Sequence, residues 1–103
     1  MTESEARAEL GQFRGQIDEL DGEILALLNR RAQIAEQIGD IKRAAGLPVV
    51  ELSRETAVVD NMVARNSGPL TNLSVSVIYR AIMLEMRRIQ ELRASQAAKG
   101  NES

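Results

Sequence analysis

The chain has 103 residues, 44% of them hydrophobic, and a formal net charge of −2, which predicts a single domain over residues 1–103 with no basic field for a nucleic-acid partner. The sequence contains neither Cys nor His, which excludes disulfides, thiolate zinc sites and catalysis by Ser–His or Cys–His pairs. No segment is apolar enough to predict a membrane span and the N-terminus is not typical of a signal peptide, so we expect a cytoplasmic protein without a membrane partner.

The first half of the chain carries an apolar seam with the 3-4 spacing of a heptad repeat, which predicts a helix from about residue 5 to Ala45. Gly46 and Pro48 supply the stop signal. From Leu10 to Lys42 this helix would be ~48 Å long, whereas a compact domain of this size is only ~33 Å across. The seam therefore needs a partner, and a homodimer is predicted. The seam residues are Leu10, Phe13, Ile17, Leu20, Ile24, Leu27, Ile34, Ile38 and Ile41.

Two further helices are predicted, a short one from about Glu51 to Arg65 and a long one from about Asn72 to Ala97. The run Asn66-Ser67-Gly68-Pro69 between them is a strong turn signal. We expect the polar tail at residues 98–103 to be frayed. The fold class is thus all-α, with three helices in the order long, short, long.

Two cations interrupt the apolar face of the first helix. Arg31 occupies the seam position between Leu27 and Ile34, and Lys42 follows eleven residues later on nearly the same face. A buried guanidinium costs free energy unless an anion meets it, although a polar residue at one heptad position can also serve to fix register. An isolated lysine can equally extend to solvent at the end of a helix. Together the two cations favour a site for a small, elongated dianion.

Four other positions are candidates for the same site. Arg14 faces about 100° away from Arg31 on an ideal helix, so it is either solvated or directed at the other subunit of a dimer. Glu55 suits the first turn of the second helix electrostatically, whereas Arg54 does not, which suggests a separate role for Arg54. Gln90 is either an ordinary surface residue or a neutral hydrogen-bond donor on an inward stripe. That stripe comprises Tyr79, Met83, Met86 and Gln90.

Read together, these residues resemble the all-helical chorismate mutase family (type II, AroQ-like). The resemblance covers about residues 10–94 in five ordered blocks. The blocks are Arg14-x-x-Ile17-Asp18-x-Leu20-Asp21-x-x-Ile24-Leu25-x-Leu27-Leu28-x-x-Arg31, then Ile38-Gly39-x-x-Lys42, then Pro48-Val49-x-Glu51-x-x-Arg54-Glu55, then Ile78-Tyr79-Arg80-x-Ile82, and finally Gln90.

The resemblance implies an intertwined homodimer that isomerises chorismate to prephenate by a pericyclic (Claisen) rearrangement. Such a reaction needs no nucleophile, metal or cofactor, which suits a chain without His and Cys. By the same resemblance, Lys42 and Gln90 would donate to the ether oxygen of the breaking bond. Glu55 would accept from the ring hydroxyl, and the backbone near Glu51 would touch the same group. Glu51 stands where the family usually has Asp.

The resemblance also assigns the carboxylates of the substrate to arginines. Arg31 would bind one carboxylate, with Arg54 beside it and Arg14 arriving from the other protomer. Met86 stands where some members carry a Ser that helps to hold a carboxylate, so Met86 is left out of the predicted site.

Two alternative functions remain open from the sequence. An isochorismate-pyruvate lyase would use the same fold and similar cations, although Glu55 suits the hydroxyl position of chorismate. A non-catalytic helical dimer could instead regulate or dock to an enzyme of the shikimate pathway. The presence of Gln90, which completes the pair of ether-oxygen donors, leads us to expect activity without such a partner.

Overall fold

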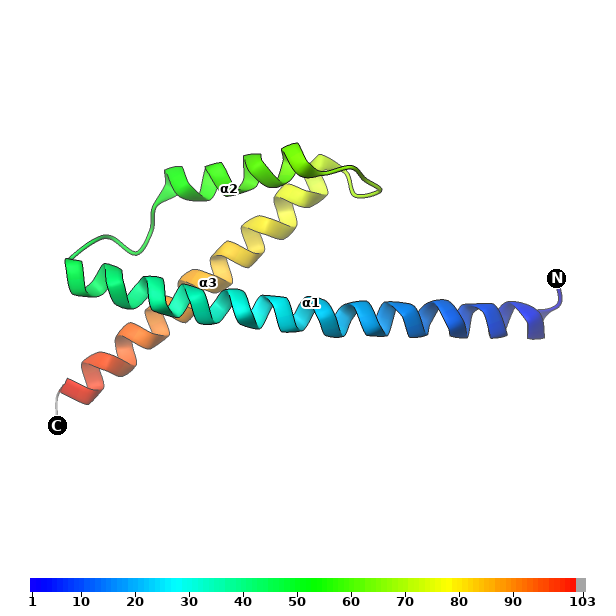
Figure 1. Ribbon diagram of the computed structural model, residues 1–103, viewed down its shortest axis with the longest axis horizontal. Helices are drawn as coiled ribbons and strands as arrows, with labels where there is room; N and C mark the ends of the chain where they lie inside the picture. Colours follow the sequence, from blue (N-terminus) through cyan, green and yellow to red (C-terminus); the bar gives the residue numbers. More distant parts are fainter. Residues whose placement is uncertain (102–103) are drawn as a thin grey trace. The chain divides into compact units, whose positions relative to one another are not determined.

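The structure, a computed structural model, describes residues 1–101. It contains α1 (Glu3–Ala45), α2 (Leu52–Arg65) and α3 (Asn72–Asn101), and residues 1–101 include no strand (Figure 1). The helices have 43, 14 and 30 residues, so the predicted all-α, long-short-long architecture is confirmed.

Local hydrogen bonds explain where α1 begins and ends. The Thr2 hydroxyl accepts from the Glu5 N–H at 3.1 Å, which satisfies one of the free donors at the start of the helix. At the other end, Gly46 has a φ of +70°, and the Leu47 N–H donates to the Lys42 carbonyl at 2.8 Å. This is the hydrogen-bond pattern of a Schellman motif, which needs a residue in the left-handed region and therefore favours glycine.

Asn66 organises the turn between α2 and α3. Its side-chain amide donates to the Leu70 carbonyl at 2.8 Å, and its side-chain oxygen accepts from the Gly68 N–H at 3.1 Å. Gly68 has a φ of +82°, a conformation that side-chain-bearing residues rarely adopt. The Thr71 hydroxyl then accepts from the Ser74 N–H at 3.0 Å and caps the start of α3.

The chain divides into two compact units, Met1–Gln33 and Ile34–Ser103, which are described separately. Within the first unit, the part of the apolar seam from Leu10 to Leu27 is in contact with solvent. Phe13 is 61% exposed, Ile17 57% and Leu27 58%, so this part of α1 buries almost nothing by itself.

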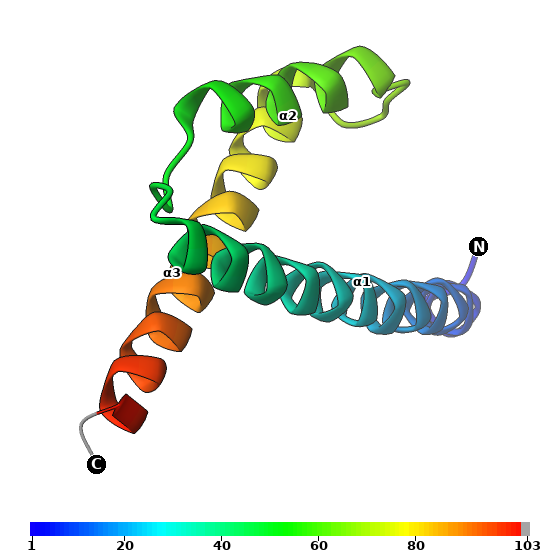
Figure 2. The same cartoon turned by 60° about the vertical axis from the view of Figure 1, so that its left-hand side comes forward.

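The second unit packs α2 against α3 and the end of α1 against α3 (Figures 1 and 2). Its buried apolar side chains are few, and none of them is aromatic. They are Ala35, Val59, Val75, Met83 and Met86.

The third helix is longer than the sequence pattern predicts. The structure extends α3 to Asn101, four residues beyond the predicted end at Ala97. Ala98 and Lys99 are good helix formers, and no proline interrupts the backbone hydrogen bonds there. The remainder of the predicted tail, residues 102–103, lies outside the described residues.

None of the helices in the described part is sufficiently long and apolar to span a membrane.

Candidate functional site

Gln90 lies where α3 meets the end of α1. It is only 9% exposed, and its side-chain amide donates to the Ala35 carbonyl at 3.0 Å. Gly39 allows this close approach, since a Cβ added there would lie 3.0 Å from the Gln90 Cγ atom. The sequence left Gln90 open between an ordinary surface residue and an inward stripe with Met83 and Met86, and the structure shows the inward position.

Lys42 follows Ala35 and Gly39 on the same face of α1, at helical spacings of four and three residues. Its ammonium donates to the Val49 carbonyl at 3.0 Å and lies 3.6 Å from a Glu51 carboxylate oxygen. The Lys42 side chain is 15% exposed, so it is held close to the protein rather than extended into solvent. These contacts also tie the loop before α2 to the end of α1.

Glu51 precedes α2 but does not cap it with its side chain, because its carboxylate turns toward Lys42 instead. The Glu51 side chain is 44% exposed, so this ion pair is partly screened by solvent.

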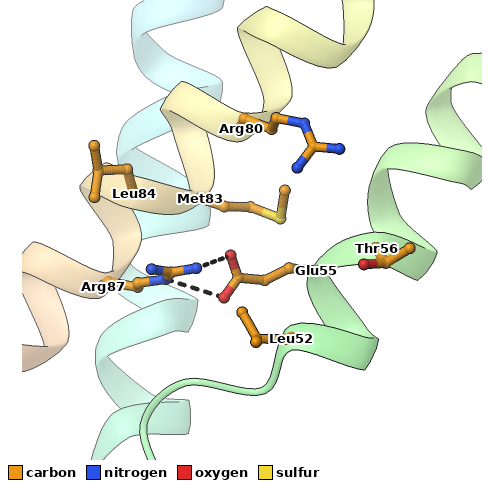
Figure 3. Close-up of a pocket in the computed structure, with 7 residues that line it drawn as sticks. All are labelled: Leu52, Glu55, Thr56, Arg80, Met83, Leu84 and Arg87. Carbon is orange, nitrogen blue, oxygen red and sulfur yellow. Dashed lines mark hydrogen bonds and ion pairs between the residues drawn. The ribbon is translucent and has the colours of Figure 1, made fainter.

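Glu55, in the first turn of α2, is paired with Arg87 of α3. The Arg87 Nε atom donates to the Glu55 Oε2 atom at 3.0 Å, and its Nη2 atom donates to Oε1. Hydrogen bonding to Glu55 raises the pKa of Arg87 above its ordinary value. Both side chains line a pocket of about 210 Å³ between α2 and α3 (Figure 3). Its other lining residues are Leu52, Thr56, Arg80, Met83 and Leu84.

An ion-pair cluster flanks the contact between α1 and α3. Arg93 donates from Nε to the Asp40 Oδ1 atom and from Nη2 to Oδ2, both at 2.8 Å, and from Nη1 to a Glu36 oxygen at 3.1 Å. The hydrogen bonds from Arg93 hold the pKa of Asp40 below its ordinary value, with a further contribution from Arg43. These side chains are 34–46% exposed, so the cluster fixes geometry more than it adds stability.

The three arginines predicted to bind carboxylates have no hydrogen-bond or ion-pair partner among residues 1–101. Arg14 is exposed and Arg31 half-exposed in the first unit, whereas Arg54 is exposed on α2. In the second unit, Gln90 of α3 thus packs against the face of α1 that carries Lys42. The predicted roles of the three arginines stay predictions. No group of Asp and Glu residues in the described part of the chain has the geometry of a metal site.

Sequence reasoning did not identify Arg87. It lies four residues after Met83, so helical spacing alone could have placed it near the inward stripe. Its partner Glu55 is 32 positions away in the sequence, and no local pattern indicates that pairing.

The second unit therefore combines fixed cations, a buried amide donor and a paired carboxylate in an all-helical protein. The sequence offers no Cys or His as nucleophile or proton shuttle, so such a site can bind and orient an anion and stabilise developing negative charge.

The sequence profile of the family described as "Chorismate mutase type II" matches residues 13–91. The bifunctional chorismate mutase/prephenate dehydratase of Neisseria gonorrhoeae is 40% identical over 77 residues, which cover 75% of this chain and 21% of that protein. The intracellular chorismate mutase of Mycobacterium tuberculosis is 42% identical over 60 residues, 58% of this chain and 57% of that protein. The crystal structure of chorismate mutase from Helicobacter pylori in complex with prephenate superposes with a TM-score of 0.80 at 27% identity, covering 85% of this chain and 96% of that one.

The chain belongs to the chorismate mutase type II family, as the resemblance of its sequence predicts. It spans about a fifth of the length of the bifunctional relative and just over half of the intracellular one.

Proposed function

We propose that this chain is an isomerase, a chorismate mutase that converts chorismate to prephenate by a pericyclic rearrangement without a cofactor. The proposal is supported by its family and by the solved relative that is described as a complex with prephenate. The reaction requires a flexible dianion to be held in a compact conformation, which is a problem of orientation and fixed charge.

The observation that carries the proposal is the packing of Gln90, from α3, against the face of α1 that carries Lys42. The Lys42 ammonium has three N–H donors and the Gln90 amide has two, and each group donates one hydrogen bond to a backbone carbonyl. The Lys42 ammonium also faces a Glu51 carboxylate oxygen, but at 3.6 Å, beyond hydrogen-bond distance, so we assign the remaining donors of Lys42 and Gln90 to the ether oxygen. Negative charge builds on that oxygen as the C–O bond breaks, so a fixed ammonium stabilises the transition state more than the ground state.

Glu55 would accept a hydrogen bond from the ring hydroxyl of the substrate. Its carboxylate lies at the pocket between α2 and α3, whose lining, among the described residues, includes neither Lys42 nor Gln90. The role of Glu55 is therefore carried over from the family resemblance. We expect the Glu51 backbone to contribute more than the Glu51 side chain, because that side chain is turned toward Lys42.

The carboxylates of the substrate would be bound by Arg31 and Arg54 from one protomer and by Arg14 from the other. All three guanidiniums lack an acceptor among residues 1–101. The exposed seam of α1 supports an intertwined homodimer. Its apolar residues are in contact with solvent, as for Ile24 at 52% exposed, and a second copy would bury them. In such a homodimer, the family resemblance assigns the Arg14 side chain to the partner's site.

The experiment compares Lys42→Ala with Arg43→Ala. Arg43 is the neighbouring cation, and its guanidinium pairs with the Asp40 carboxylate at 3.0 Å. We expect Lys42→Ala to lower kcat/KM for chorismate by about 10²–10³, the usual effect of losing such a donor, and Arg43→Ala to stay near the wild type. Near-normal turnover by Lys42→Ala would refute the assignment.

Product analysis of the purified wild-type chain separates the alternative functions. Prephenate from chorismate supports the mutase, whereas salicylate and pyruvate from isochorismate would indicate the lyase. Neither product would indicate a docking role toward a shikimate-pathway enzyme. We expect full activity without such a partner, and a cytoplasmic location.

A further inference from the structure

The pairing of Arg87 with Glu55 is more constrained than an ordinary surface ion pair. The Arg87 side chain is 32% exposed and the Glu55 side chain 22% exposed, and two adjacent nitrogens of the guanidinium each donate to a different oxygen. A bidentate arginine restricts both the rotation and the tilt of the carboxylate, which a single hydrogen bond does not do. The Glu55 carboxylate therefore has one preferred orientation.

This orientation matters because the pair lies at the pocket between α2 and α3 (Figure 3). Apolar side chains from Leu52, Met83 and Leu84 form much of the remaining lining. Arg87 occupies two of the roughly four lone-pair sites of the carboxylate, so about two remain available as acceptors. A hydroxyl that enters the pocket would meet an acceptor whose direction is already fixed.

We propose that Arg87 is a positioning residue that holds the Glu55 carboxylate as the acceptor for the substrate hydroxyl. This inference rests on the proposed function, in which Glu55 binds the ring hydroxyl of chorismate. Arg87 acts through Glu55 and is not itself a catalytic residue. Because the hydroxyl takes no part in bond breaking, the interaction contributes to binding of the ground state and of the transition state alike, so its loss raises KM rather than lowering kcat.

A purely structural role for the pair predicts a different result. If Arg87 only fastened α2 to α3, its removal would lower the fraction of folded enzyme. That fraction scales the apparent kcat and leaves KM unchanged, so the two kinetic constants separate the two roles.

The test uses Arg87→Met, Glu55→Gln and the double variant in the full chain, with Arg88→Met as the control. Arg88 is adjacent on α3, and its guanidinium pairs with Glu85 at 2.7 Å on the surface, where the two side chains are 63% and 57% exposed. We expect Arg87→Met to raise KM for chorismate about tenfold, the effect of weakening one hydrogen bond to a charged group, with kcat within about threefold of the wild type. In the Glu55→Gln background the same substitution should raise KM less than it does in the wild type, because the neutral amide cannot form the bidentate ion pair with Arg87.

Arg87→Lys provides a second variant if Arg87→Met fails to fold. A lysine keeps the charge but cannot make the bidentate contact, so KM should again rise severalfold. An unchanged KM in Arg87→Lys, or an equal rise of KM on removing Arg87 with and without Glu55, would overturn this inference while leaving the proposed function intact. If the wild type does not convert chorismate, the proposed function and this inference both fall.

Discussion

The substitution Gly39→Ala adds one methyl group where α1 packs against Gln90 in the second unit. In Gly39→Ala the new Cβ would lie 3.0 Å from the Gln90 Cγ atom and 3.3 Å from its Cβ atom. Carbon atoms prefer ~3.5–4.0 Å, so Gln90 has to move by several tenths of an ångström. Overpacking of this kind typically costs about 1–3 kcal/mol, against a gain of about 1 kcal/mol from the higher helix propensity of alanine. The strained contact also endangers the hydrogen bond from Gln90 to the Ala35 carbonyl.

Gly22→Ala is the matched control. Gly22 lies in α1 as well, on the side opposite the seam, and a Cβ added there has no described atom within 4 Å apart from its chain neighbours and the nearby backbone of its own helix. Gly22→Ala should therefore be stabilised by about 1 kcal/mol through the higher helix propensity of alanine, without a clash.

The assay is thermal unfolding of both variants and the wild type at equal protein concentration. We expect Gly22→Ala to unfold at a higher temperature than the wild type and Gly39→Ala at a lower one, with about 4–8 °C per kcal/mol in a domain of this size. Displacement of Gln90 should also lower kcat of Gly39→Ala by at least about tenfold, whereas Gly22→Ala should keep it. A Gly39→Ala variant as stable and as active as Gly22→Ala would refute the close packing of Gln90 on α1.

Two further predictions concern acid stability and assembly. The folded pKa of Asp40 lies below its ordinary value of 3.8 because Arg93 donates to it, so its contribution to stability is complete above about pH 4 and is lost as the pH falls through the folded pKa. Denaturant unfolding between about pH 4 and pH 2 should therefore show a smaller loss of stability in Asp40→Asn than in the wild type, and equal losses would contradict the role of this pair. For assembly, Leu27→Glu places a charge on the seam, where the native side chain is 58% exposed, and should abolish the proposed dimer. Asn29→Glu, on the opposite side of α1, should sediment like the wild type, and a Leu27→Glu variant that does the same would argue against the seam as the interface.

The sequence alone determined the helices, their order and most of their ends. Heptad and 3.6-residue spacing reports which side chains share a face, and Gly46, Thr71 and the turn at residues 66–69 act through neighbours only a few positions away. The same periodicity placed Gln90 on one stripe with Met83 and Met86 but left open whether Gln90 faces inward. It did not locate the end of α3, because alanine and lysine continue a helix as readily as they end one.

Only the tertiary structure decided which of these faces meet and which side chains pair. Glu55 was predicted as a site residue from the family resemblance, but its pairing with Arg87 joins residues 32 positions apart, and the contact of Gln90 with Ala35 joins residues 55 apart. The need for glycine at position 39 likewise comes from a side chain of another helix rather than from the backbone of α1. Spacing along a helix fixes direction around its axis, whereas pairing depends on how separate helices pack, and that information lies in no single stretch of the chain.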